Sequence, residues 1–495
     1  MRFAERVRRG LVWNQLGRAV ELGSGYAASV VAARAFGVVT FGTWSLALSI
    51  LGLAALAGSL GLNETLNAQV PRLQGSPGRV SWLLRHLLRL RAGIALVLAG
   101  ALFFAAPAIA LAWRHPALAP VLETAAIYAF FTQVSQLLEY FLIGRLEVPR
   151  VSRVRAAVQL LHLAAAGAAL RWHFLPRQLF LAMAVNAALG VVALLWSVRA
   201  ALATPPERFD LKPLLGFGAA LWATSLVNFF VGRQSDVLII GLFHPGTEQA
   251  GIYSAAATLA MLLAGALLIG AEGVGLAAFS EVASRVDRAG LGRLWSLHVK
   301  MDVLLSVPAL VFGAVFAREL VTTLYGPGFA GAERLLVAYA AVWVAARTLG
   351  GGTNLAALYA MNEARVPLAI FAAAGALNLV GDLILVPRLA AAGAVIATGC
   401  ATLSAGLATG LLVRRRTGAT FPVRFAVQVL VVALAAAGFA ALLPRPRGLA
   451  GLALAAVLVA AATLGGLMLL RPLESEDRRL LLRLAPRLDW LLARI

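Results

Sequence analysis

The stretch TFGTWSLALSILGLAALAGSLGL, residues 40–62, contains no charged side chain and is mostly apolar. A helix that crosses about 30 Å of hydrocarbon needs about 20 mainly apolar residues, so this segment is long enough to span a membrane. The whole chain has the same character, because 61% of its residues are hydrophobic, 13% are charged and the mean hydropathy is +0.85. Soluble proteins carry about 25% charged residues. The composition therefore predicts an all-α polytopic membrane protein without a soluble domain.

The same length criterion, applied along the chain, predicts fourteen transmembrane helices. Their approximate limits are 11–35, 40–62, 89–112, 119–143, 154–171, 178–199, 213–241, 249–275, 301–324, 334–360, 366–386, 390–412, 423–443 and 449–470. The last part of the chain, 471–495, alternates Leu and Trp with Arg, which is typical of an amphipathic helix at a membrane surface.

The 43 Lys and Arg residues are distributed unevenly between the two predicted faces of the membrane. With fourteen spans, 31 of them lie in or beside the termini and the loops on the same side as the termini, and 8 lie in the opposite loops. Basic residues accumulate in cytoplasmic loops, so both termini are predicted to be cytoplasmic. Nucleic-acid-binding proteins concentrate their basic residues on one face or stripe. Here the net charge of +21 comes from small groups between apolar runs, so no nucleic-acid partner is predicted.

A shift of 209 residues reveals an internal repeat, in which FGTWSLA of residues 41–47 aligns with AGIYSAA of residues 250–256. The matched positions are Trp13 with Trp222, Gly37 with Gly246, Gly42 with Gly251, Trp44 with Tyr253 and Ser45 with Ser254. Six spans separate the two copies, so both copies cross the membrane in the same direction. This predicts two pseudo-symmetric six-helix lobes, 1–200 and 213–412, with a substrate site between them and two additional helices in 423–470. Chance similarity between Ala-rich helices is the alternative interpretation.

Several predicted spans contain ionisable side chains, which are costly in hydrocarbon and therefore indicate a polar cavity or a functional partner. Arg18 and Glu21 are three residues apart, as are Arg233 and Asp236, while Tyr339, Trp343 and Arg347 follow one helical face. The predicted substrate-binding residues of a cationic cavity are Arg18, Arg233, Arg347, Tyr339, Trp343 and Gln136. The predicted ion-coupling residues are Glu21, Glu139, Asp236, Glu272 and Asp382. The alternative is that the polar pairs hold helices together and that the aromatic residues serve ordinary packing.

The sequence contains no Walker A motif, no HExxH motif and no paired metal-binding His, and Cys400 is its single cysteine. We therefore predict no cofactor and no metal. Transport without an ATP site has to be driven by an ion gradient, the membrane potential or a substrate gradient. Arg would suit a phosphate or pyrophosphate substrate, because its planar guanidinium donates two hydrogen bonds at once.

Three segments carry a resemblance to a known family: ARAFGVVTFGTWSLALSILGLAALAGSLGLNETL at 33–66, SDVLIIGLFHPGTEQAGIYSAAATLA at 235–260 and ELVTTLYGPGFAGAERLL at 319–336. Together with the number of spans, they resemble the oligosaccharide flippases of the multidrug/oligosaccharidyl-lipid/polysaccharide (MOP) superfamily, of the O-antigen transporter type. The resemblance implies alternating access that moves undecaprenyl-pyrophosphate-linked oligosaccharides across the bacterial cytoplasmic membrane for O-antigen or exopolysaccharide synthesis. It implies a lipid-linked oligosaccharide and membrane lipids as partners. Glycan polymerase or assembly proteins are further candidate partners.

Relatives that flip the peptidoglycan lipid precursor use Arg residues in a cationic cavity. Arg18, Arg233 and Arg347 are candidates for this role by their chemistry and not by an exact motif match, and Glu21 and Asp236 would orient them or accept protons. The chain carries no strict signature of either subfamily, so the glycan stays open.

Two other functions are compatible with a polytopic membrane protein of this kind. A drug or cation antiporter of the same superfamily would be expected to have an acidic cavity, against which the Arg-bearing helices argue. A membrane glycosyltransferase or O-antigen polymerase would carry substantial outward loops, whereas no predicted outward loop exceeds about ten residues. A scaffold without transport activity would not account for the charges inside the spans.

Overall fold

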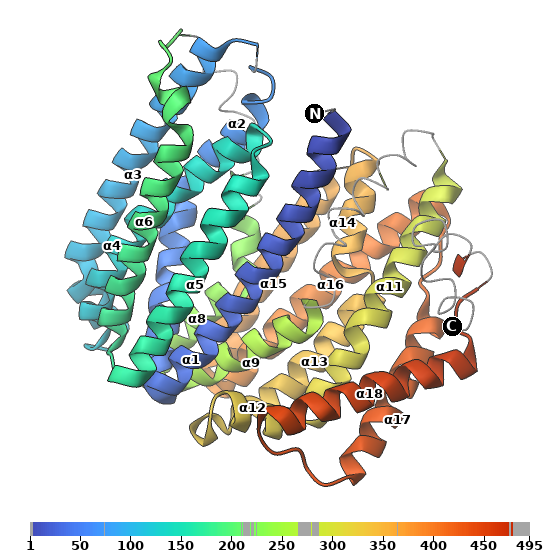
Figure 1. Ribbon diagram of the computed structural model, residues 1–495. Helices are drawn as coiled ribbons and strands as arrows, with labels where there is room; N and C mark the ends of the chain where they lie inside the picture. The colour runs from blue at the N-terminus through green and yellow to red at the C-terminus, as the bar shows by residue number, and fades with distance from the viewer. Residues whose placement is uncertain are drawn as a thin grey trace. The chain divides into compact units, whose positions relative to one another are not determined.

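The computed structural model describes residues 3–73, 75–208, 225–265, 287–363 and 365–474, with the further positions 210, 218, 222, 223, 279, 477 and 478. In the first helix, side chains are described from residue 17 onward, except that of residue 18. Every regular element in this part of the chain is a helix (Figure 1). The predicted all-α class is confirmed.

Within each described range, consecutive helices are mostly joined by short connections. The long ones are α1 (Phe3–Ser59), α3 (Pro77–Ala112), α4 (Leu118–Gly144), α5 (Val148–Trp172), α6 (Pro176–Ala203), α11 (Arg288–Val315), α15 (Arg365–Leu389), α16 (Ala391–Thr417), α17 (Val423–Leu442) and α18 (Gly448–Leu470). The shorter ones are α2 (Leu62–Gln69), α8 (Arg233–Phe243), α9 (Glu248–Gly265), α12 (Ala317–Leu324), the 3-10 turn η2 (Pro327–Phe329), α13 (Ala332–Thr348) and α14 (Gly351–Ala360).

Ten helices of the described part are long and apolar enough to cross a membrane, by length and composition. Twelve of the fourteen predicted spans overlap helices of the structure. The other two, at 213–241 and 249–275, include residues that the structure does not describe. α1 contains the first two predicted spans as two helical segments that meet at a kink inside the predicted boundary at 36–39. It is broken there only at Gly37, whose φ of 69° lies in the left-handed region that favours glycine.

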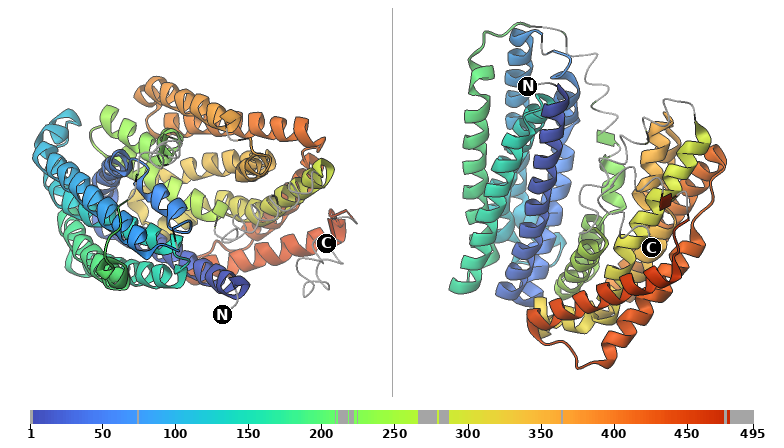
Figure 2. Two further views of the ribbon diagram at one scale, coloured as in Figure 1. Left: turned by 90° about the horizontal axis from the view of Figure 1, so that it is seen from above. Right: turned by 45° about the vertical axis from the view of Figure 1, so that its right-hand side comes forward.

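The chain divides into two compact units, Met1–Ser254 with Asp382–Ala391, and Ala255–Gly381 with Ala392–Ile495. In the first unit α1 packs along α5, and α4 lies between α3 and α6. These helices run roughly parallel to one another (Figure 2). A cluster of Leu, Val and Phe side chains from α2, α3, α4 and α6 fills the interior of this bundle. The predicted lobe limits of 1–200 and 213–412, and the predicted tail 471–495, stay predictions.

In the second unit α11 is the central element, because α13, α14, α17 and α18 all pack against it. The run Gly350-Gly351-Gly352 lies where α13 ends and α14 begins, with φ of 94° at Gly350. The buried Asn354 stabilises this break: its Oδ1 accepts from Trp295 Nε1 at 2.9 Å, and its Nδ2 lies 2.9 Å from the Leu349 carbonyl. Helix ends leave carbonyls without intrahelical partners, and the Asn354 amide satisfies one of them.

Candidate functional site

The first unit contains a three-residue charged cluster that joins three helices. Glu139 of α4 accepts hydrogen bonds from Ser135 Oγ at 3.1 Å and from Arg155 Nε of α5 at 2.8 Å. Arg155 also reaches Glu21 of α1, with Nη1 at 3.8 Å from its Oε2. Glu139 is 9% exposed, so its charge is balanced inside the protein by Arg155. Two of the predicted ion-coupling residues, Glu21 and Glu139, therefore share Arg155 as a partner.

Arg155 is a residue that the sequence analysis missed, because it was counted with the basic residues at a predicted cytoplasmic loop. Its position at the start of a weakly apolar helix gave no signal of an inward orientation. The side chain of Arg18 lies outside the described residues, so a pair between Arg18 and Glu21 stays a prediction. Gln136, predicted to line the cavity, is exposed on α4.

A second cluster consists of two buried carboxyl groups, Asp236 in the first turn of α8 and Asp382 in α15, both 0% exposed. Their side chains are hydrogen-bonded to each other. Asp236 also accepts from Ser235 Oγ at 3.3 Å and from the hydroxyl of Tyr253. A hydrogen bond between two carboxyl groups requires one shared proton. The structure thus joins two predicted ion-coupling residues that are 146 positions apart in the sequence.

Asn378 lies one helical turn before Asp382 in α15 and is also fully buried. Arg233, a predicted substrate-binding residue, begins α8 and is partly exposed. It interacts electrostatically with Tyr26 of α1. Glu272 falls outside the described residues.

In the second unit Arg347 lies in the last turn of α13 and is held by several groups. Its Nη1 lies 3.9 Å from Oδ2 of Asp302 on α11, and its Nη2 donates to the Ala264 carbonyl of α9 at 3.1 Å. The guanidinium also lies 5.5 Å from the centre of the Trp343 ring. Asp302 in turn accepts from Thr353 Oγ1 at 2.8 Å.

The Arg347 and Asp302 side chains are each 14% exposed. Asp302 is a second partner that the sequence analysis missed. Tyr339 is 5% exposed, and Trp343 packs against a small apolar cluster that includes Leu310. Their packing agrees with the alternative interpretation of the aromatic stripe. The cationic cavity itself stays a prediction.

Arg91 of α3 is a buried charge that the sequence analysis counted with a predicted cytoplasmic loop. It is 0% exposed, its Nη1 donates to the Gly58 carbonyl, and its Nε donates to the Gln133 carbonyl at 3.3 Å. Gly58 belongs to the last turn of α1, where carbonyls lack intrahelical partners and a cation is favourable. Arg91 therefore caps α1 and ties it to α4.

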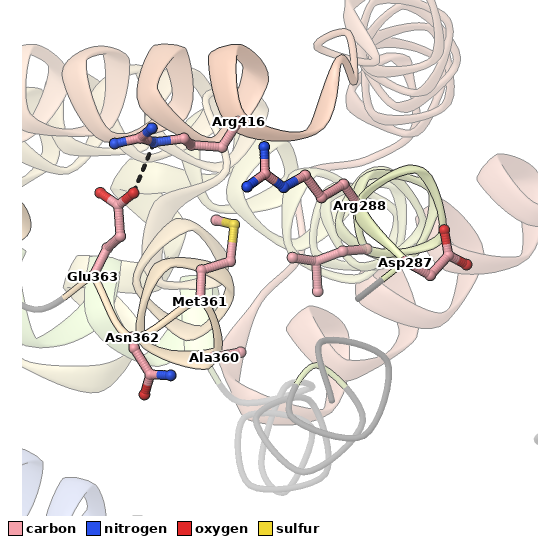
Figure 3. A pocket seen from close by; sticks show the side chains of 8 residues that line it. Asp287, Arg288, Ala360, Met361, Asn362, Glu363 and Arg416 are labelled. Carbon is pink, nitrogen blue, oxygen red and sulfur yellow. Dashed lines mark ion pairs between the residues drawn. The ribbon is translucent and has the colours of Figure 1, made fainter. Parts of the chain in front are cut away.

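A polar pocket of about 240 Å³ lies at the ends of α11, α14 and α16 (Figure 3). Arg416 Nε pairs there with Glu363 Oε1 at 2.7 Å, and Met361 lies below the side chains of Arg288 and Arg416. Acidic and basic side chains both line the pocket, and the ion pair joins the α14–α15 turn to α16. We interpret it as a connection between helices.

The glycines that the repeat aligns, Gly42 and Gly251, pack directly against each other. A Cβ at Gly42 would overlap the Thr247 carbonyl oxygen and approach Gly251 N to 3.0 Å. A Cβ at Gly251 would overlap the Val38 carbonyl oxygen and approach Gly42 N to 3.2 Å. The same shift of 209 residues converts Val38 into Thr247 and Gly42 into Gly251, so the contact is isologous, as at a two-fold axis. The two aligned segments therefore make equivalent contacts with each other at this glycine crossing.

Hydrogen bonds surround the glycine crossing at the predicted outward ends of the helices. Thr43 Oγ1 lies 2.8 Å from His115 Nε2 and 3.3 Å from Thr247 Oγ1. Thr247 Oγ1 donates to the Val39 carbonyl at 2.8 Å, and Trp113 Nε1 donates to the Leu238 carbonyl at 3.2 Å. Segments from both copies of the repeat are thus closed against each other at this end.

Comparison with known families gives one match: residues 31–333, more than half of the chain, match the family described as "Polysaccharide biosynthesis protein". No curated protein sequence matches the chain at significant similarity.

Several solved transporter structures share the fold. The inward closed conformation of the lipid II flippase MurJ matches with a TM-score of 0.73 and 13% identity, covering 93% of this chain and 98% of the flippase. An inward-facing multidrug resistance MATE family transporter of the MOP superfamily matches with a TM-score of 0.68 and 14% identity, covering 80% and 94%. A MOP superfamily transporter from Pyrococcus furiosus matches with a TM-score of 0.56 and 15% identity, covering 83% and 95%. At these identities the matches show the fold, which is that of MOP-superfamily transporters.

Proposed function

The chain belongs to the polysaccharide biosynthesis protein family, and on that premise we propose that it is a flippase that moves an undecaprenyl-pyrophosphate-linked oligosaccharide across the bacterial cytoplasmic membrane. The observation that carries the proposal is the family match in a chain with a MOP-transporter fold. The product would serve cell-surface polysaccharide synthesis, such as that of O-antigen or an exopolysaccharide. Both termini are proposed to be cytoplasmic, on the distribution of Lys and Arg.

Alternating access requires that each end of the molecule can close. The glycine crossing supports a proposal for the outward gate, because Gly42 and Gly251 allow backbone contact between the two copies of the repeat. Thr43, His115 and Thr247 add polar contacts that can break and reform at modest cost, since a typical hydrogen bond contributes only about 0.5–1.5 kcal/mol net. We propose that the gate opens when the substrate is released outward.

The charged residues support a proposal for substrate recognition and coupling. Arg18, Arg233 and Arg347 are proposed to bind the pyrophosphate, with Tyr339, Trp343 and Gln136 contributing contacts to the glycan. Asp236 and Asp382 are proposed to take up the coupling cation, a proton or a metal cation of the same charge. Glu21 and Glu139 are proposed to change their pairing with Arg155 during transport, because a buried cation shared by two carboxylates can shift between them. Glu272 remains a further candidate for coupling.

The proposal is tested in proteoliposomes that contain the purified protein and a fluorescent undecaprenyl-pyrophosphate oligosaccharide. The fraction of glycan that reaches the opposite leaflet is measured with an impermeant quencher. We expect wild type to move the glycan and Arg155→Gln to move it about tenfold more slowly, because its buried partner Glu139 loses its cation. Arg171→Gln, at the other end of α5, serves as the control and should transport at the wild-type rate.

The same vesicles distinguish the flippase from an antiporter. Ethidium, a small organic cation, is loaded inside, and its efflux is followed under a proton gradient and under a sodium gradient. Clear ethidium efflux without movement of the lipid-linked glycan would overturn the flippase proposal in favour of the antiporter.

A further inference from the structure

A groove of about 510 Å³ lies on the first unit, where α5 begins and α6 ends. Its lining includes Arg150, Arg153, Leu189, Val192, Trp196 and Ser197. Three of these apolar side chains are strongly exposed: Leu189 is 55%, Val192 64% and Trp196 69% exposed. Such exposure is expected where a helix faces hydrocarbon, so one side of the groove is suited to acyl chains.

Two arginines at the groove carry positive charge that no carboxylate balances within the described part of the chain. Arg153 is exposed, and its Nε donates to the Pro149 carbonyl at 3.2 Å. Arg199 lies on the Trp196 ring, with its guanidinium carbon 3.8 Å from the ring centre. The third arginine, Arg150, is already engaged with Glu147. The groove is therefore apolar on one side and cationic on the other.

This combination matches the chemistry of a phospholipid in the inner leaflet. The groove lies at the predicted cytoplasmic ends of α5 and α6, where the membrane surface carries anionic lipids. A Trp at this depth is typical of the interface between headgroups and acyl chains. An Arg guanidinium presents paired donors that fit two phosphate oxygens.

We propose that this groove binds an anionic phospholipid, with the headgroup phosphate on Arg153 and Arg199 and an acyl chain along Leu189 and Val192. Stacking on Trp196, which lines the groove, holds the Arg199 guanidinium beside it. The bound lipid is a component of the surrounding bilayer and is distinct from the lipid-linked oligosaccharide.

The experiment compares three forms of the full-length protein in detergent: wild type, Arg153→Gln/Arg199→Gln, and the control Arg171→Gln/Arg177→Gln. The control removes the same charge from the same two helices at their opposite ends. Native mass spectrometry measures the binding of added phosphatidylglycerol and, separately, of phosphatidylcholine with the same acyl chains. Thermal unfolding of each form establishes that it is folded.

We expect wild type and the control to bind phosphatidylglycerol more tightly than phosphatidylcholine. The groove variant should bind phosphatidylglycerol about 25-fold more weakly, because it lacks two arginines and each Arg near the surface contributes about fivefold to anionic lipid binding. Equal affinities of the groove variant and wild type would overturn the proposal. So would an equal loss in both double variants, which would indicate attraction by net charge alone. Because the readout is lipid binding, the result does not depend on whether the protein transports glycans.

Discussion

Replacing Gly42 by alanine is expected to slow the transport of lipid-linked oligosaccharide at least tenfold. The added Cβ would overlap the Thr247 carbonyl oxygen, which is backbone and cannot rotate away as a side chain can. The α1 segment after Gly37 would have to separate from the α8–α9 turn, and the hydrogen bond between Thr43 and Thr247 would break with it. The measurement is glycan translocation in proteoliposomes, with the amount of folded protein determined for each variant.

The repeat predicts that Gly251→Ala has the same effect, because its Cβ would overlap the symmetry-related Val38 carbonyl. Gly25→Ala is the matched control on α1, since a Cβ at Gly25 would meet nothing within 4 Å. Wild-type transport by both Gly42→Ala and Gly251→Ala would show that the outward ends need not approach this closely during the cycle.

The second large effect is expected for Asp382→Asn, which should abolish the response of transport to an ion gradient. The carboxamide has the shape of a protonated carboxyl group and can donate a hydrogen bond to Asp236, so the fold should be retained. It cannot release or exchange a proton, however, and it removes one of the two charges available to a metal cation. We expect glycan transport to fall about tenfold and to become independent of the driving gradient.

Proton and sodium gradients are applied separately in this experiment, so that the wild-type response identifies the coupling ion. Asp236→Asn should behave like Asp382→Asn, because both carboxyl groups belong to one hydrogen-bonded pair. Asp287→Asn is the control, since Asp287 caps α11 by accepting from Gly290 N at 2.7 Å. If Asp382→Asn kept both the rate and the gradient response of wild type, the pair would be structural.

The helices could be predicted because their signal is local. Apolar length indicates a span wherever it occurs, and the spacing of glycines in the two copies is visible without knowledge of contacts. The shift of 209 residues aligned the two glycines that meet, although only the structure shows their contact. The predicted boundary at 36–39 contains the kink at Gly37 where the two helical segments of α1 meet, but the sequence did not show that the connection is this short.

The partners of the buried charges could not be predicted, because they depend on which helices are neighbours. Spacing suggested pairs within one helix, such as Arg18 with Glu21. The described ion pairs of Glu139 and Arg347 instead join different helices, to Arg155 and Asp302. A carboxylate or an arginine carries the same local signal whether its partner is three residues away or on another helix. Arg91 and Arg155 were missed for a related reason, because both lie near predicted loops where basic residues are expected in any case.

The most direct test of the account is a reversible lock on the outward gate. Thr43→Cys/Thr247→Cys is made in a Cys400→Ser background, which removes the chain's own cysteine. The two threonine hydroxyls are 3.3 Å apart, close enough for the replacing sulfurs to form a disulfide after a small rotation.

Transport of the undecaprenyl-pyrophosphate oligosaccharide is then measured in proteoliposomes after oxidation and again after reduction. We expect movement of the glycan in the reduced protein, its loss on oxidation and its return on reduction. Equal transport in the oxidised and reduced proteins, with the disulfide verified, would contradict the proposal that the gate opens here. No movement of the glycan in either state or in wild type would contradict the flippase proposal itself.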